Sequence, residues 1–118
     1  MEMVRGLFFD AGGTVFDWKN TAWVQWDGIL SCEFLGYYKP SLQSYKKGVR
    51  LLELQPAEAM MVAAHEGDLT AAQAAGLHTA FIKVPEKDVI DDVFGQPDKT
   101  SFDVEAADFD DLCNKLKV

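Results

Sequence analysis

A run of apolar residues that ends in an aspartate and two glycines constrains the fold of this chain more than any other feature. Residues 3–9 are apolar at all but two positions, which is typical of a buried strand in a parallel sheet. Asp10 follows directly. Open α/β sheets carry their reactive groups just beyond the carboxyl ends of such strands, so the sequence places Asp10 where a catalytic group would stand.

The residues after Asp10 favour a tight turn. Gly12 and Gly13 have no side chains, so the chain can fold back and turn the backbone N–H groups of Ala11, Gly12 and Gly13 toward an anion beside the Asp10 carboxylate. The same residues also fit an ordinary strand followed by an Asx-type turn. This segment alone leaves both interpretations open.

Predicted strands and helices alternate along the rest of the chain, the pattern of a parallel sheet covered on both faces. Strands are expected at residues 28–32, 60–64 and 79–82, with a last edge strand that starts at Val104. Helices are expected at 20–26, from Pro40 with Leu42, Tyr45, Val49 and Leu52 on one face, at 69–75 before Gly76, and at 109–116. We therefore expect one α/β domain over residues 1–118, a three-layer, Rossmann-like core with a mostly parallel sheet.

Three blocks of the sequence, residues 9–17, 26–40 and 60–81, together resemble the haloacid dehalogenase superfamily, and most closely its 2-haloacid dehalogenase branch. The resemblance implies that Asp10 is a nucleophile that forms an ester intermediate. It implies that Lys39, in Tyr38-Lys39-Pro40, pairs with this carboxylate, and that Asp68 holds Lys39 or helps to activate water. Without the resemblance, Lys39 would be read as a surface lysine and Asp68 as an N-cap for a helix from Leu69.

This sequence departs from the superfamily's patterns at two positions, and these departures indicate which of the superfamily's reactions to expect. Phosphatases of the superfamily carry a second aspartate at the position of Gly12 and a magnesium-binding aspartate at the position of Ala64. Both acids are missing, so the resemblance implies a metal-independent dehalogenase type of hydrolase with no metal and no cofactor. His65 is either a donor to Asp10 or Asp68, and so part of the substrate site, or a structural residue.

The segment between Asp10 and Lys39 is short for a member of this branch, which normally carries a helical cap and a second strand there. It has room for one helix and one short strand, at ~1.5 and ~3.3 Å per residue, but not for a cap as well. We therefore expect a minimal, capless core that lacks the strand of the second motif. Such a core uncovers apolar surface and sheet edges, so a homodimer with residues 16–38 at or near the contact is expected. The alternative is repair within one chain, in which residues 28–32 lie beside the strand at 3–9 and close the gap.

The composition limits the kinds of partner that this protein is expected to bind. The net charge is −8, which argues against nucleic acid and anionic membranes, because both attract basic surfaces. No apolar run reaches the ~20 residues of a membrane span, the start does not read as a signal peptide, and the two cysteines have no metal-type spacing. A cytoplasmic location is expected.

Two functions remain open. In the first, the chain is a hydrolase core that resembles 2-haloacid dehalogenases, acts on a small anionic substrate, and has weak or lost activity. In the second, the same scaffold is a non-catalytic binding or assembly module.

Overall fold

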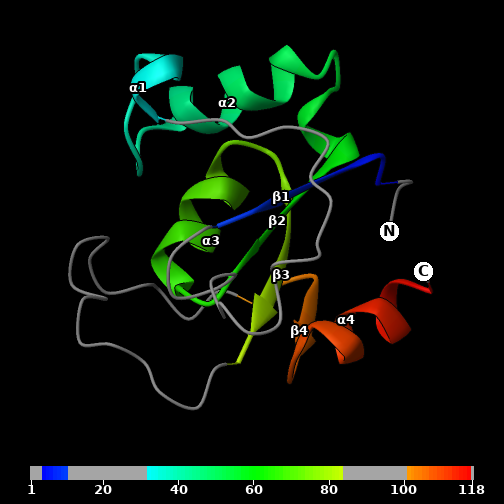
Figure 1. Ribbon diagram of the computed structural model, residues 1–118. Coiled ribbons are helices and arrows are strands. Elements are labelled where there is room, and N and C mark those ends of the chain that lie inside the picture. Colours follow the sequence, from blue (N-terminus) through cyan, green and yellow to red (C-terminus); the bar gives the residue numbers. More distant parts are fainter. Residues whose placement is uncertain (1–3, 11–31, 84–100, 118) are drawn as a thin grey trace.

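The computed structural model describes residues 4–10, 32–83 and 101–117 (Figure 1). Within these ranges strands and helices alternate, as the sequence predicts. The strands are β1 (Gly6–Phe9), β2 (Ala59–Ala63), β3 (His78–Ile82) and β4 (Val104–Ala106). The helices are α1 (Cys32–Leu35), α2 (Leu42–Leu51), the 3-10 helix η1 (Pro56–Glu58), α3 (Glu66–Ala74) and α4 (Phe109–Leu116).

The four described strands form one parallel sheet in the order β1-β2-β3-β4. In register, Phe9 pairs with Val62 and Ala63 with Phe81, so the carboxyl ends of the first three strands lie at one edge of the sheet. The backbone N–H of Asp10 donates to the carbonyl oxygen of Val62 at 3.0 Å, which extends the pairing to the last residue before the turn. The predicted parallel α/β fold is confirmed.

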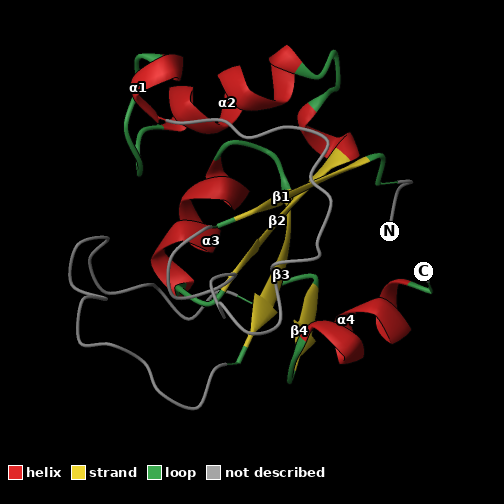
Figure 2. Ribbon diagram, viewed as in Figure 1, coloured by secondary structure: helices red, strands yellow, loops and turns green. Residues whose placement is uncertain are grey.

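Helices cover the sheet on both faces (Figure 2). On one face, Tyr45 and Val49 of α2 and Leu69 of α3 pack against alternate strand residues such as Met61. On the other face, α4 packs against the strand residues that point the opposite way, which include Met60. This alternation follows from the two-residue period of a strand, and the result is the predicted three-layer arrangement.

Helix α2 begins at Leu42, two residues after the predicted start at Pro40, because the Ser41 side chain accepts the backbone N–H of Gln43 and caps the helix. The predicted apolar face is correct at Tyr45 and Val49, which are 6% and 1% exposed. It is wrong at its ends, since Leu42 and Leu52 are 39% and 50% exposed. Those two residues lie where the helix starts and just after it ends, beyond the sheet that covers its centre.

Helix α3 begins at Glu66, three residues before the predicted start, so the interpretation of Asp68 as the N-cap is wrong. His65 occupies the cap position and Asp68 lies in the first turn. Acidic residues in a first turn are favourable because the helix dipole is positive there. The helix ends at Ala74, one residue before the predicted Ala75, and Gly76 follows with a φ of +96°, a conformation that glycine adopts without strain.

Several expectations fall outside the described residues. They include the helix at 20–26, most of the strand at 28–32, and the turn of Ala11, Gly12 and Gly13. The last residue of that predicted strand, Cys32, begins helix α1. None of the helices in residues 4–10, 32–83 and 101–117 has the length and apolar character needed to cross a bilayer.

Candidate active site

Three side chains from distant parts of the chain meet at the carboxyl end of the sheet. Asp10 comes directly after β1, Asp68 lies in the first turn of α3 after β2, and Lys39 precedes α2. The sequence predicts that they lie together, because the strands of a parallel sheet all end at the same edge. Contacts among the three side chains confirm this proximity, while their chemical roles stay predictions.

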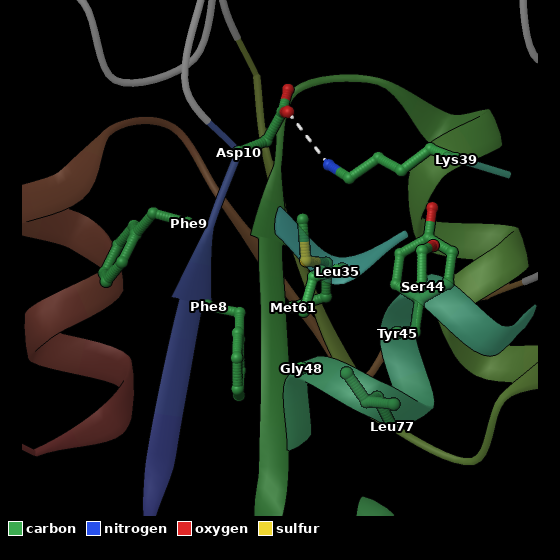
Figure 3. Close-up of a pocket in the computed structure, with 10 residues that line it drawn as sticks. All are labelled: Phe8, Phe9, Asp10, Leu35, Lys39, Ser44, Tyr45, Gly48, Met61 and Leu77. Carbon is green, nitrogen blue, oxygen red and sulfur yellow. Dashed lines mark hydrogen bonds and ion pairs between the residues drawn. The ribbon is translucent and has the colours of Figure 1, made fainter. Parts of the chain in front are cut away.

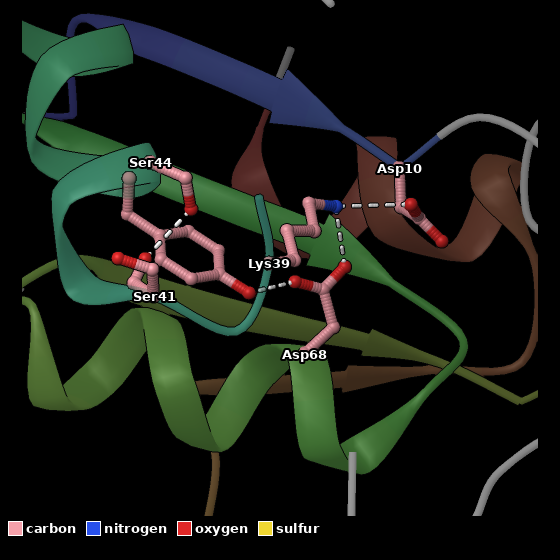
Figure 4. A network of polar contacts seen from close by, with 6 residues as sticks. Asp10, Lys39, Ser41, Ser44 and Asp68 are labelled. Atoms are coloured by element: carbon pink, nitrogen blue, oxygen red, sulfur yellow. Dashed lines mark hydrogen bonds and ion pairs between the residues drawn. The ribbon is translucent and has the colours of Figure 1, made fainter. Parts of the chain in front are cut away.

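The ammonium group of Lys39 bridges the two carboxylates (Figure 4). Its Nζ donates to Oδ1 of Asp10 at 3.0 Å and to Oδ2 of Asp68 at 2.8 Å. The side chain of Asp68 is 1% exposed, whereas those of Asp10 and Lys39 are 19% and 25% exposed. The three side chains are therefore buried at Asp68 and partly exposed at Asp10, the side from which a small molecule can reach them.

Tyr45 completes the anchor. Its hydroxyl donates to Oδ1 of Asp68, the oxygen that Lys39 does not contact. The ring of the same tyrosine lies 6.0 Å from the Lys39 Nζ, at the outer limit of a cation–π contact. Because Asp68 accepts one hydrogen bond on each oxygen, its carboxylate is held in a fixed orientation and in turn fixes the lysine.

The electrostatics of the site favour a charged lysine and an aspartate that is less acidic than usual. Burial raises the pKa of the Asp10 carboxyl above its ordinary range, and the nearby Asp68 adds to this, against the opposing effects of Lys39 and His65. Burial works against the charged form of Lys39, but the carboxylates of Asp68 and Asp10 outweigh it and raise the pKa of Lys39. The lysine is therefore still protonated at the pH where Asp10 becomes ionised.

His65 and Ala64 flank the site between β2 and α3. His65 is partly buried, and its electrostatic interaction with Asp10 lowers the pKa of that carboxyl. Ala64 is completely buried and has no oxygen in its side chain to offer a cation. Groups of three or more side chains suited to a metal ion do not occur in the part of the chain that the structure describes.

A cavity of about 330 Å³ opens beside this group, between β1 and α2 (Figure 3). Asp10 and Lys39 lie at one end, and the walls are formed mostly by apolar side chains. The lining includes Phe8, Leu35, Ser44, Tyr45, Gly48, Met61 and Leu77. A pocket of this size is at the lower end of those that bind small ligands.

Sequence reasoning misses three contributors to the site. The helical pattern predicts Tyr45 only as a core residue, although a buried tyrosine hydroxyl needs a partner and this one donates to Asp68. No prediction concerns Ser44 and Gly48, yet both are buried and line the cavity. A serine and a glycine on the inner side of an otherwise apolar helix face are the available signal, because neither fills the space that a core side chain would.

Comparison with solved structures shows which proteins this fold resembles. The structure of the L-2-haloacid dehalogenase PA0810 matches with a TM-score of 0.68 and 39% identity over 79% of this chain. The defluorinating L-2-haloacid dehalogenase Rha0230 matches with a TM-score of 0.64 and 37% identity, also over 79% of this chain.

The match covers 40% and 38% of those two chains, so this chain spans about two fifths of their length. No protein-family model and no curated protein matches the sequence. The shared fold and the identity over most of the chain agree with the resemblance that the sequence blocks indicate. The chain therefore has the core fold of the haloacid dehalogenase superfamily and is similar to its L-2-haloacid dehalogenases.

Proposed function

We propose that this chain is the core of a hydrolase of the haloacid dehalogenase type, with Asp10 as the nucleophile and a small 2-halo acid as the substrate. The observation that carries the proposal is the Lys39 ammonium group held between Asp10 and the buried Asp68. This contact orients the Asp10 carboxylate at the end of a parallel strand and keeps a positive charge beside it.

The reaction has two steps. An oxygen of Asp10 attacks the halogen-bearing carbon, the carbon–halogen bond breaks, and the halide leaves with the electron pair. Water then adds to the carboxyl carbon of the resulting ester, which releases a 2-hydroxy acid and restores Asp10. The oxygen of the water stays in the Asp10 carboxylate, so the water gives up both of its protons. One protonates the departing oxygen of the hydroxy acid, and the other is released to solution with the nearby Asp68 as the proposed acceptor, so one proton appears for each halide released.

Metal independence is expected from the leaving group and from the residues at two positions. Halide needs no protonation, so the reaction does not require the general acid that Gly12 replaces. Ala64 lies where the resemblance predicts a magnesium ligand, and its methyl group is fully buried. A phosphatase would need an oxygen ligand at this position to hold a hard cation.

The test measures halide release from small 2-halo acids and phosphate release from a generic phosphate ester, each with magnesium and with a chelator. We expect halide release that magnesium does not change and that Asp10→Asn abolishes. Asp110→Asn provides the matched control, because Asp110 is exposed on α4, on the opposite face of the sheet from α2 and α3. Magnesium-dependent phosphate release would overturn the proposal.

Heavy-oxygen water tests the ester directly. In a single turnover with excess protein, the water oxygen enters the Asp10 carboxylate and not the hydroxy acid, because water attacks the ester at its carboxyl carbon. Mass spectrometry of the peptide that contains Asp10 detects the label. Label found only in the product would mean that water displaces halide directly, and no halide release at all would favour the binding or assembly module.

A further inference from the structure

We propose that the cavity between β1 and α2 binds the aliphatic chain of the substrate, so that the site prefers 2-halo acids with an unbranched chain over the shortest ones. This inference rests on the proposed function for the reacting end of the molecule. It adds a chain-binding subsite inside the core, below Asp10, and its walls come from residues that no step of the reaction uses.

The walls have the chemistry that an alkyl chain requires. The apolar lining includes Phe8 of β1, Leu35 of α1, Met61 of β2 and Leu77 before β3 (Figure 3). Leu35, Met61 and Leu77 are 6%, 4% and 6% exposed, so very little of these side chains contacts solvent. Transfer of a methylene from water to such a surface is favourable.

The polar groups gather at one end. Asp10 and Lys39 stand where the reaction occurs, and Tyr45 turns its hydroxyl to Asp68. Ser44 also lines the cavity, but its hydroxyl donates to the carbonyl oxygen of Ser41 at 2.7 Å, so its hydrogen is already used. A ligand in this cavity therefore meets polar partners at its head and apolar contacts along its chain.

The sheet register gives the depth of the cavity. Asp10 lies four residues beyond Gly6, which pairs with Ala59, and Leu77 precedes the His78 that pairs with Met60. At ~3.3 Å per residue, Leu77 lies roughly 13 Å below the level of Asp10. The cavity thus runs along the strands, and does not spread across the mouth of the site.

The volume of the cavity limits the length of the aliphatic chain that it can hold. Water occupies about 30 Å³ per molecule, so 330 Å³ holds about ten groups of that size. A six-carbon 2-halo acid has a comparable number of non-hydrogen atoms. We therefore expect the preference to rise from the two-carbon acid to the six-carbon acid and to fall for chains that exceed the cavity.

Gly48 provides the variant that separates chain binding from chemistry. It lies on the inner face of α2, it lines the cavity, and it is remote in sequence from Asp10, Lys39 and Asp68. A valine here adds a side chain at a position that lines the cavity, at little cost in helix propensity, since glycine is itself a poor helix former. Gln43→Val is the matched control, because Gln43 is exposed on the same helix.

The first experiment compares kcat/KM for 2-bromoacetate, 2-bromopropanoate, 2-bromobutanoate, 2-bromohexanoate and 2-bromodecanoate. Each buried methylene is expected to raise kcat/KM about fourfold, which gives roughly 60-fold between the three-carbon and six-carbon acids. Gly48→Val should remove most of this gain, whereas Gln43→Val should retain it and leave kcat/KM for 2-bromopropanoate within about twofold of the parent. If Gly48→Val does not fold, Gly48→Ala gives a smaller loss of the same kind.

The second experiment needs no turnover. Hexanoate is added to protein with isotope-labelled methionine methyl groups, and the methyl signals are followed by NMR. Met61 lines the cavity, while Met60 belongs to the core on the opposite face of the sheet and acts as the internal control. We expect hexanoate to shift the Met61 signal and not that of Met60, and Gly48→Val to abolish the shift.

The outcomes distinguish the two proposals. Bromide release without any dependence on chain length, together with an unchanged Met61 signal, would overturn the chain-binding subsite and leave the proposed reaction intact. A specific Met61 shift in a protein that releases no bromide would support the subsite and overturn the proposed reaction.

Discussion

Replacement of Lys39 by methionine tests whether the ion-pair group holds the core together as well as the site. Methionine keeps the length and the apolar stem of lysine but removes the charge, so the carboxylates of Asp10 and Asp68 lose their shared partner. Because Asp68 is 1% exposed, water cannot replace the lost contact. We expect Lys39→Met to be strongly destabilised near neutral pH.

The distances from Lys39 to the two carboxylates give the size of the expected loss of stability. At an effective dielectric constant of about 20, charges 2.8 and 3.0 Å apart attract by about 6 kcal/mol each. Most of this offsets the cost of removing the charges from water, and the removal of one partner from a buried pair costs about 3–5 kcal/mol in proteins. Lys39 and Asp10 are 25% and 19% exposed, so we expect the low end, about 3 kcal/mol, or about 10 °C in Tm for a chain of this size.

The assay is urea unfolding of the parent and the variant from pH 4.5 to 8. Without Lys39 the pKa of the Asp10 carboxyl rises further in the folded state, and a carboxyl group with a raised folded-state pKa contributes a stability that is lost as the pH rises through that pKa. The loss of stability in Lys39→Met is therefore largest at pH 8 and smaller at pH 4.5. Lys46→Met, at a partly buried lysine of helix α2, should stay within about 0.5 kcal/mol of the parent. A loss that does not vary with pH would refute the electrostatic reasoning.

Three further predictions concern the same face of the molecule. Tyr45→Phe removes a hydrogen bond to a buried carboxylate, and urea unfolding should show a loss of about 1.5–3 kcal/mol. The rate of halide release should fall on acidification, with a midpoint above the ordinary aspartate pKa of about 3.9. The reason is that the pKa of Asp10 is raised and only its ionised form attacks, and a pH–rate profile measures this midpoint. The chain should behave as a homodimer in light scattering, and Phe34→Ser with Tyr38→Ser should give monomers, since these side chains are 70% and 66% exposed.

The parts of the fold that sequence reasoning predicts are those where local pattern and tertiary structure agree. The last helix, α4, spans Phe109–Leu116 as expected, with Asp108 as its cap and Lys117 in the left-handed conformation that ends it. The apolar runs that end at Phe9 and Ala63 form two neighbouring strands of the parallel sheet, β1 and β2, where the run of apolar residues predicts them. The meeting of Asp10 with Lys39 is harder to predict, because it depends on where the chain returns after the turn.

The parts that escape prediction depend on contacts between distant residues. Helix α3 starts early because Glu66 and Asp68 favour a first turn, although Gly67 between them weakens the helical pattern in the sequence. The helical period places Tyr45 on an inner face, but no local pattern states that its hydroxyl donates to Asp68. A cavity is less predictable still, since it arises where small residues such as Gly48 face a wall that does not collapse onto them.

The cavity and the charged group are also coupled through water. Burial is the largest cause of the raised pKa of Asp10, so the carboxylate already stands in a poorly hydrated position, and the partly open cavity beside it is where solvent can enter. An alkyl chain that fills the cavity excludes this solvent and strengthens the attraction between Asp10 and Lys39. Chain contacts that are equal in the ground state and the transition state lower only KM. Exclusion of water from a nucleophile acts on the chemical step, so longer substrates should raise kcat as well, and a chain-length series in which KM alone changes would limit the cavity to binding.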